Sequence, residues 1–145
     1  MYEVRVQAVI TGEPAIVWAV VSDVAGWPRW DPHEEAARID GPFATGTTGW
    51  SKPHGAPGAS WTLTDVEGPH RWASSCALPG GGLRGLNTFE QVGPTRVRCT
   101  KTVQVTGPLV PLFRAWFGPR MRRDMVRTLA ALEQEAARRS APEVS

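Results

Sequence analysis

The feature that most constrains this chain is a series of six strand-length segments separated by glycine and proline. The segments span residues 33–40, 46–52, 59–66, 70–78, 83–92 and 96–106. Their connections are too short for the long crossovers that join parallel strands, so the series predicts an antiparallel meander. One face of such a sheet can meet water, and its other face needs an apolar cover.

Two further segments precede this series. Residues 3–11 predict a seventh strand, because apolar side chains recur at every second position. Pro14 can occupy the first turn of a helix, and the apolar run after it predicts a helix that ends near Ser22. Residues 26–32 contain two prolines and two tryptophans, which favours short helical turns over a regular element.

The apolar cover is predicted at the C-terminal end of the chain. Apolar residues recur there at steps of three or four, as on one face of a helix. The residues of this stripe are Leu109, Phe113, Phe117, Met121, Met125, Leu129, Leu132 and Ala136. Gly118-Pro119 predicts a kink or break between a short and a long piece. The long piece, residues 119–139, would extend about 30 Å, which is enough to cross the sheet.

Composition restricts the function classes. The 145 residues are 41% apolar, and no run approaches the roughly 20 apolar residues that span a bilayer. The first residues alternate rather than form a signal peptide. The formal net charge of +2 does not point to an anionic partner, so no nucleic-acid partner is expected. We therefore expect one cytoplasmic domain over residues 1–139, with a frayed tail over 140–145, no integral membrane association, and a monomer or weak homodimer. Cys76 and Cys99 are expected as free thiols, with a disulfide as the alternative.

Five motifs, in this order, resemble the polyketide cyclase/dehydrase branch of the START-like (SRPBCC) superfamily over about residues 2–137. They are Pro14-x-x-x-Trp18 with Ser22-Asp23, Trp27-Pro28-x-Trp30-Asp31-Pro32, Asp40-Gly41-Pro42-Phe43, Thr95-Arg96-Val97 and Gly107-Pro108-Leu109. The resemblance implies an α+β helix-grip fold. In that fold a curved seven-stranded antiparallel sheet wraps around a long C-terminal helix, and two short helices follow the first strand. It also implies a ligand cavity between sheet and helix, with no universal catalytic set.

Strand alternation, taken with this resemblance, predicts which side chains face the cavity. From the sheet they are Trp61, Leu63, Trp72, Ser74, Cys76, Asn87, Phe89, Cys99, Lys101 and Val103, and from the helix Phe113, Trp116, Phe117, Met121 and Met125. Seven of the twelve aromatic residues are Trp, which combines an apolar surface with one N–H donor and suits a ring-bearing ligand. For any single Trp an ordinary place in the core is favoured, and the pocket gains support only from these residues taken together.

Three of these residues are weak catalytic candidates, namely Lys101, Asn87 and Ser74. A desolvated Lys101 could act as a base or orient an acidic ligand, or it could reach water from the edge of a strand. Asn87 stands where this branch often has an inward-facing His, and an amide cannot transfer protons near neutral pH. Glu34 replaces an apolar residue of the relatives and is expected to face solvent rather than the cavity mouth.

Other chemistries lack a pattern in the sequence. The three His residues show no metal-ligand spacing, and no nucleophile motif or phosphate-binding glycine loop is present, so no metal and no cofactor are expected. Arg120, Arg122, Arg123 and Arg127 could contact nucleic acid or membrane, but the solvated side of an amphipathic helix is favoured.

Three functions stay open. The first is binding or carriage of a hydrophobic, aromatic or polyketide-like small molecule. The second is a cyclase, aromatase or dehydratase that uses polar groups in the same cavity. The third is a protein-partner module that makes contact through the Trp27–Trp30 segment or the arginine face. Convergence of titratable groups inside the cavity would separate the second function from the first.

Overall fold

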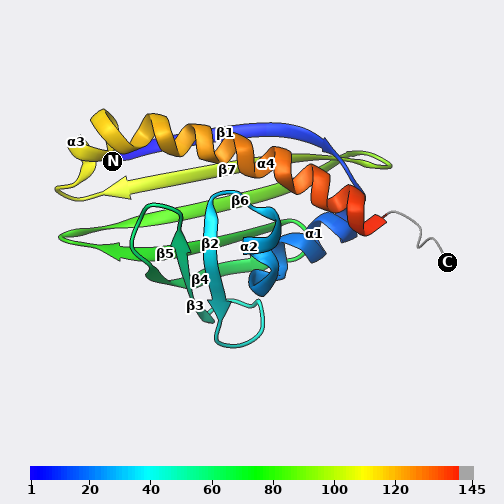
Figure 1. Ribbon diagram of the computed structural model, residues 1–145, viewed down its shortest axis with the longest axis horizontal. Helices are drawn as coiled ribbons and strands as arrows, with labels where there is room; N and C mark the ends of the chain where they lie inside the picture. Colours follow the sequence, from blue (N-terminus) through cyan, green and yellow to red (C-terminus); the bar gives the residue numbers. More distant parts are fainter. Residues whose placement is uncertain (141–145) are drawn as a thin grey trace.

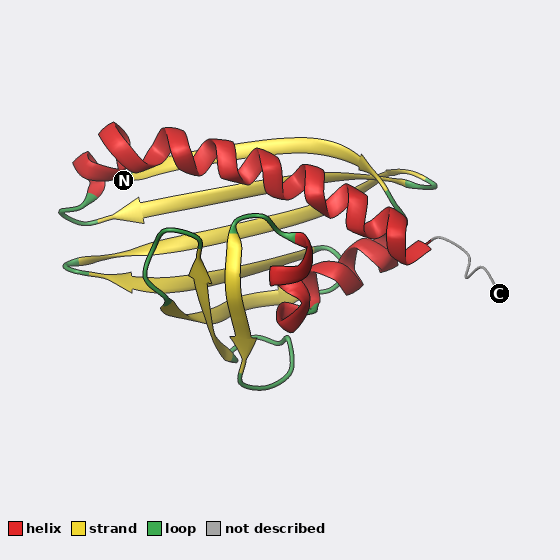
Figure 2. Ribbon diagram, in the orientation of Figure 1, coloured by secondary structure: helices red, strands yellow, loops and turns green. Residues whose placement is uncertain are grey.

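A seven-stranded antiparallel sheet curls around one long helix in the computed structural model, which describes residues 1–140 (Figures 1 and 2). The strands are β1 (Tyr2–Thr11), β2 (Glu34–Ile39), β3 (Thr48–Pro53), β4 (Ala59–Glu67), β5 (Arg71–Leu78), β6 (Gly81–Gly93) and β7 (Arg96–Thr106). Their order in the sheet is β1-β7-β6-β5-β4-β3-β2. The predicted α+β helix-grip fold is confirmed, and the strand bounds differ from the predicted ones by two residues or fewer.

Pairing of the first strand with the last brings distant residues into one row. Lys101 on β7 lies between Val6 on β1 and Asn87 on β6, and Asn87 in turn lies opposite Trp72 on β5. Because side chains alternate along a strand, residues in one such row share a face of the sheet. Bulges in β2, β4 and β6 interrupt the ladder and add curvature. The row through Lys101 therefore lies on the concave side.

Short helices connect β1 to β2, as predicted. They are α1 (Pro14–Ser22), the single turn η1 (Val24–Gly26) and α2 (Trp27–Trp30). Pro14 and Pro28 each occupy a first helical turn, where their missing N–H costs nothing. Figure 1 shows these helices close to one end of the C-terminal helix.

The C-terminal helix is continuous across Gly118-Pro119, so the predicted break is wrong. Three segments follow one another without a gap: α3 (Val110–Leu112), the π-helical turn η2 (Phe113–Phe117) and α4 (Gly118–Ser140). The Gly118 N–H donates to the carbonyl of Phe113, five residues earlier. A proline ring collides with the carbonyl four residues before it in a regular α-helix, and the wider π turn before Pro119 relieves this collision.

The π turn also changes which side chains face the sheet. It inserts one residue, so the inward-facing position passes from the partly buried Phe113 to the buried Gly118 instead of Phe117. Gly118 packs directly against the Tyr2 phenol, where any larger residue would collide with the hydroxyl group. Phe117 and Trp116 are turned outward and are 40% and 60% exposed. The predicted stripe is correct from Met121 onward and wrong at Phe117, whereas Leu109 and Phe113 are partly buried.

The core consists of two clusters that lie on the concave face. The larger joins α4 and α1 to β1 and β7 through Val4, Val6, Ile10, Val17, Val20, Val21, Trp30, Val97, Cys99, Met125, Leu129, Leu132 and Ala136. The smaller contains Val24, Trp61 and Leu63. No helix within residues 1–140 combines the length and apolar character needed to cross a membrane. The helix ends at Ser140, and residues 141–145 of the predicted tail lie outside the described residues.

We predict that Met125→Ala lowers the free energy of unfolding by about 2–5 kcal/mol, because it leaves a cavity where α4 meets the sheet. Met125 is 5% exposed, whereas its neighbour Val126 is 53% exposed on the opposite face. Val126→Ala is the matched control and should stay within about 0.5 kcal/mol of the parent protein. Urea unfolding of both variants measures the difference, and equal losses would contradict the packing of α4 described here.

Candidate functional site

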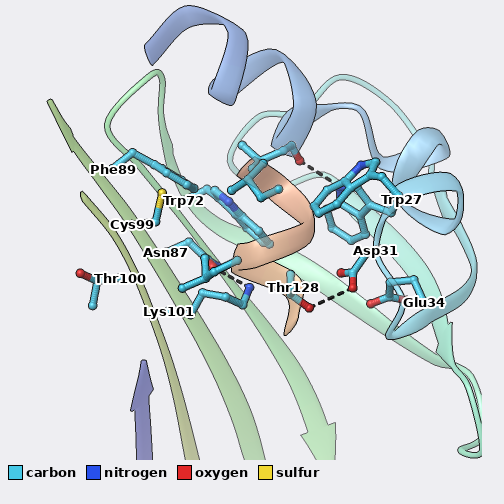
Figure 3. Close-up of a pocket in the computed structure, with 14 residues that line it drawn as sticks. Trp27, Asp31, Glu34, Trp72, Asn87, Phe89, Cys99, Thr100, Lys101 and Thr128 are labelled. Atoms are coloured by element: carbon cyan, nitrogen blue, oxygen red, sulfur yellow. Dashed lines mark hydrogen bonds between the residues drawn. The ribbon is translucent and has the colours of Figure 1, made fainter. Parts of the chain in front are cut away.

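A partly enclosed cavity of about 100 Å³ lies between the sheet and the middle of α4. Strands β5, β6 and β7 form one wall, and α1, α2 with the start of β2, and α4 form the others (Figure 3). Its lining consists of Val21, Trp27, Trp30, Asp31, Glu34, Trp72, Asn87, Phe89, Cys99, Thr100, Lys101, Thr128, Leu129 and Leu132.

The cavity is smaller than expected and lies farther along the helix. The sequence predicts that Phe117, Met121 and Met125 face the cavity, and sites for drug-sized ligands enclose about 300–1,000 Å³. Instead α4 contributes Thr128, Leu129 and Leu132.

A chain of contacting aromatic rings explains the reduced volume. Trp27 stacks on Trp61 and packs against Trp72, with ring centres 5.9 Å apart in both pairs. Phe43 packs edge-on against Trp72, with ring centres 5.4 Å apart, and also packs edge-on against Trp18. These rings fill much of the space between the short helices and the sheet, so only a compact volume is left beside them.

The predicted cavity residues divide into two groups. Trp72, Asn87, Phe89, Cys99 and Lys101 line the cavity. The remaining ones do not line it: Trp61, Leu63, Ser74, Cys76, Val103, Phe113, Trp116, Phe117, Met121 and Met125. Most of these belong to the core or pack against it, and Trp116 and Phe117 are exposed.

Lys101 points into the cavity from β7. Its Nζ donates a hydrogen bond of 2.9 Å to Oδ1 of Asn87, the residue opposite it on β6 (Figure 3). Loss of hydration lowers the pKa of Lys101 from its ordinary value, and the charges of Asp31 and Glu34 oppose that shift. Lys101 as a whole is only partly buried, so the alternative interpretation, a side chain that reaches water from a strand edge, stays open.

Asp31 joins α2 to the C-terminal helix. Its Oδ1 accepts hydrogen bonds from the Thr128 hydroxyl at 2.9 Å and from the backbone N–H of His33 at 3.0 Å. The backbone N–H of Glu34 donates to the Asp31 carbonyl at 3.2 Å. Asp31 and Thr128 are both 8% exposed. These bonds fix the short segment that carries Glu34 against α4.

Glu34 lines the cavity, contrary to the expectation that it faces solvent. Burial raises the pKa of its carboxyl group from 4.5 to about 7, the nearby charge of Asp31 adds to the shift, and Lys101 opposes it. Figure 3 shows Asp31 and Glu34 on one side of the cavity and Lys101 with Asn87 on the other. A carboxyl group and an amine with shifted pKa values thus share one small volume.

Unpartnered polar atoms gather around the same cavity. Three buried side-chain atoms lack a hydrogen-bond partner within residues 1–140, namely Nε1 of Trp30, Nε1 of Trp72 and Oε2 of Glu34. All three residues line the cavity. An unpaired buried polar atom costs about 1–3 kcal/mol. Two indole donors and one carboxyl oxygen without a partner therefore belong to residues that line one cavity.

Both cysteines are free thiols, as expected. Cys99 contributes a buried wall of the cavity, and burial raises the pKa of its thiol to about 12. A thiol with so high a pKa carries almost no thiolate near neutral pH, so it is a poor nucleophile. Among the described residues, no group of three or more His, Cys, Asp or Glu side chains could hold a metal ion.

Sequence reasoning missed eight cavity residues besides Glu34. They are Val21, Trp27, Trp30, Asp31, Thr100, Thr128, Leu129 and Leu132. Two signals could have found several of them. Trp27, Trp30 and Asp31 belong to a motif that already carried the family resemblance, and Thr128 is a polar residue next to the apolar stripe of a helix.

Comparison with known proteins identifies one family and many solved structures with the same fold. The family described as polyketide cyclase/dehydrase and lipid transport matches residues 1–137. No curated protein matches the chain.

Three solved structures illustrate the shared fold. The Zhui aromatase/cyclase from Streptomyces sp. R1128 is 18% identical, with a TM-score of 0.79, and the match covers 97% of this chain and 96% of that one. Norcoclaurine synthase from Thalictrum flavum, in complex with dopamine and hydroxybenzaldehyde, is 10% identical at a TM-score of 0.75, with coverages of 97% and 89%. A START superfamily protein from Mycobacterium smegmatis is 13% identical at a TM-score of 0.67, with coverages of 96% and 97%. At these identities the likeness shows the fold alone.

We predict that Glu34 makes stability depend on pH between about 4.5 and 7. A raised pKa means that the folded protein retains a proton that the unfolded chain releases, so this stabilisation is complete below pH 4.5 and is lost as pH rises to about 7. Relative to Glu34→Gln, the wild-type protein should therefore lose free energy of unfolding across this range. Urea unfolding at a series of pH values measures the difference, and a constant offset between the two proteins would contradict the prediction.

Proposed function

The chain belongs to the polyketide cyclase/dehydrase and lipid transport family, and from that premise we propose that its cavity binds a compact, oxygen-bearing ring compound. The observation that carries the proposal is that every unpartnered buried side-chain atom of residues 1–140 belongs to a residue that lines this one cavity. An oxygen acceptor on the occupant would satisfy the indole N–H groups of Trp30 and Trp72.

The size of the ligand follows from the packing. A cavity of about 100 Å³ lies well below the roughly 300–1,000 Å³ of sites that hold drug-sized molecules. The Trp27, Trp72 and Phe43 rings limit expansion toward β3 and β4, because each already contacts another ring. A single ring with one or two oxygen substituents fits this volume better than a fused polyketide or an acyl chain.

The orientation of the ligand follows from the charges. Lys101 uses one of its three N–H donors on Asn87, so the others can meet a carbonyl or phenolic oxygen. Trp72 lies next to Asn87 in the same row of the sheet, so its indole N–H supports the same side of the ligand. The ring itself would lie among Phe89, Leu129 and Leu132.

A second candidate function is acid–base catalysis on the bound compound. Glu34 has a pKa of about 7. A carboxyl group with such a pKa can both accept and donate a proton at neutral pH. In a dehydration, Glu34 would remove a proton from the carbon next to the carbonyl group while Lys101 stabilises the enolate oxygen. The enolate then reforms the carbonyl and expels a β-hydroxyl group, to which Glu34 returns the proton, so that water leaves and a C=C bond forms.

The third hypothesis, a protein-partner contact at the Trp27–Trp30 segment or at the arginine face, loses support at the first of these two places. Trp30 is 9% exposed, and the partly buried Trp27 donates its indole N–H to the Val21 carbonyl at 3.0 Å. Side chains that are packed inside in this way are not available to a partner.

We predict that 4-hydroxybenzaldehyde binds the wild-type protein and that two cavity variants bind it more weakly. Lys101→Met removes a charged donor and should weaken binding about tenfold or more, and Trp72→Phe removes one N–H and should weaken it about two- to tenfold. Isothermal titration calorimetry measures both affinities.

Matched controls exist for each variant. Lys52→Met changes the other lysine, which pairs with Glu35 at the surface, and Trp50→Phe changes a tryptophan outside the cavity lining. Both controls should bind like the parent protein. Equal affinity in all five proteins would contradict the assigned site, and preferential binding of a fused-ring or acyl-chain compound would contradict the size argument.

We predict further that the protein accelerates exchange of the methyl protons of acetophenone in D₂O, a reaction that requires enolisation. The rate should rise with pH through about 7, as Glu34 ionises, and should fall at least a hundredfold in Glu34→Gln. Proton NMR follows the loss of the methyl signal. Binding of acetophenone without faster exchange than in buffer would exclude this second function and favour simple carriage.

A further inference from the structure

An apolar ridge projects from the surface at the start of the C-terminal helix. Leu112, Trp116 and Phe117 are 48%, 60% and 40% exposed, and they lie within one and a half turns of each other. Their exposure has a local cause, since the π turn before Pro119 rotates Trp116 and Phe117 away from the sheet. Exposed aromatic clusters of this kind mark interaction sites rather than ordinary surface.

Four arginines lie near this ridge in the sequence, and one of them, Arg122, donates a hydrogen bond of 3.1 Å to the Arg5 carbonyl on β1. Arg114, Arg120, Arg122 and Arg123 lie in residues 109–123, and that segment contains no Asp or Glu. The Arg120 guanidinium lies over the Trp116 ring, 5.9 Å from its centre, and Arg114 lies at the same distance over Tyr2. The first carboxylate after this segment belongs to Asp124, and its Oδ2 lies 3.3 Å from Nδ1 of His33. Residues 109–123 therefore carry four positive charges and no negative one, although the whole chain carries only +2.

We propose that residues 109–123 dock the protein on an anionic phospholipid surface. In the docked state Leu112 and Trp116 enter the headgroup region, and the arginines contact lipid phosphates. This proposal goes beyond the small-molecule function and does not depend on it, because the ridge is separate from the cavity-lining part of α4 at Thr128, Leu129 and Leu132.

Shape favours a lipid surface over a protein partner. A stable protein interface buries about 800 Å² on each side, which three projecting side chains of one helix do not provide. Helices that lie in a membrane interface instead combine a short apolar edge of Trp, Phe and Leu with flanking basic residues. Tryptophan in particular is enriched at headgroup depth.

The position of the ridge also permits docking. Figure 1 shows α3 and the start of α4 at one end of the molecule, beside the N-terminus, whereas the β6–β7 turn lies at the other end. A flat membrane can therefore meet the ridge without displacing the short helices α1 and α2 that enclose the cavity.

The test is sedimentation of the full chain with vesicles of equal parts phosphatidylglycerol and phosphatidylcholine, compared with vesicles of phosphatidylcholine alone. The wild-type protein should bind the anionic vesicles at least tenfold more tightly, and added salt should weaken this binding. Trp116→Ala and Arg120→Gln should each reduce binding about fivefold. Val92→Ala and Arg96→Gln, at the opposite end of the molecule, are the matched controls and should bind like wild type.

Several results would overturn the proposal. Two of them are equal binding to both vesicle types and no binding to either. A third is that Trp116→Ala and Arg120→Gln bind as tightly as wild type, with circular dichroism showing that both variants are folded. Light scattering adds one more outcome: if wild-type protein is a dimer and Trp116→Ala is a monomer, the ridge is a contact between two copies and not a lipid-binding surface.

Discussion

The structure depends on how the space between a curved sheet and one helix is filled. Met125, Leu129, Leu132 and Ala136 bring α4 onto β1 and β7, but the same helix cannot reach the strands on the far side of the curl. A second set of side chains must fill that region, and the linked rings from Trp61 through Trp27 and Trp72 to Phe43 do so. The cavity is the space left between the residues that pack under α4 and the linked aromatic rings. Its walls therefore combine α4, the sheet and α2.

Charge then determines what that small volume can do. Lys101, Asp31 and Glu34 meet in surroundings with little water, where an ionised group is expensive unless it is paired. Asp31 is stabilised by donors from Thr128 and His33, and Lys101 by Asn87. Glu34 has no such partner on Oε2. It therefore responds by taking up a proton more readily, and its pKa moves into the range where proton transfer at neutral pH is efficient.

The fold could be predicted from the sequence to a large extent, because glycine and proline delimit the strands and alternation assigns their faces. The inward direction of Lys101 and Asn87 follows from the same alternation and from pairing across β6 and β7. Two features could not be predicted in this way. The π turn depends on the steric demand of Pro119 on the preceding carbonyl groups, and a periodicity argument assumes a regular helix. The inward position of Glu34 depends on how the Asp31–Thr128 bond anchors a short segment 97 residues distant in sequence.

The unpartnered atoms of the cavity connect stability with function. Trp30 and Trp72 each bury an indole N–H without an acceptor, and phenylalanine at either position would avoid that cost. A chain optimised for stability alone has no reason to retain these donors. An occupant that supplies an oxygen recovers the lost hydrogen bonds on binding, and this recovery adds to its affinity. Because such a ligand binds only the folded protein, it also raises the free energy of unfolding in proportion to the logarithm of its concentration. The free energy that unpaired polar groups cost the folded protein thus favours an oxygen-bearing ligand.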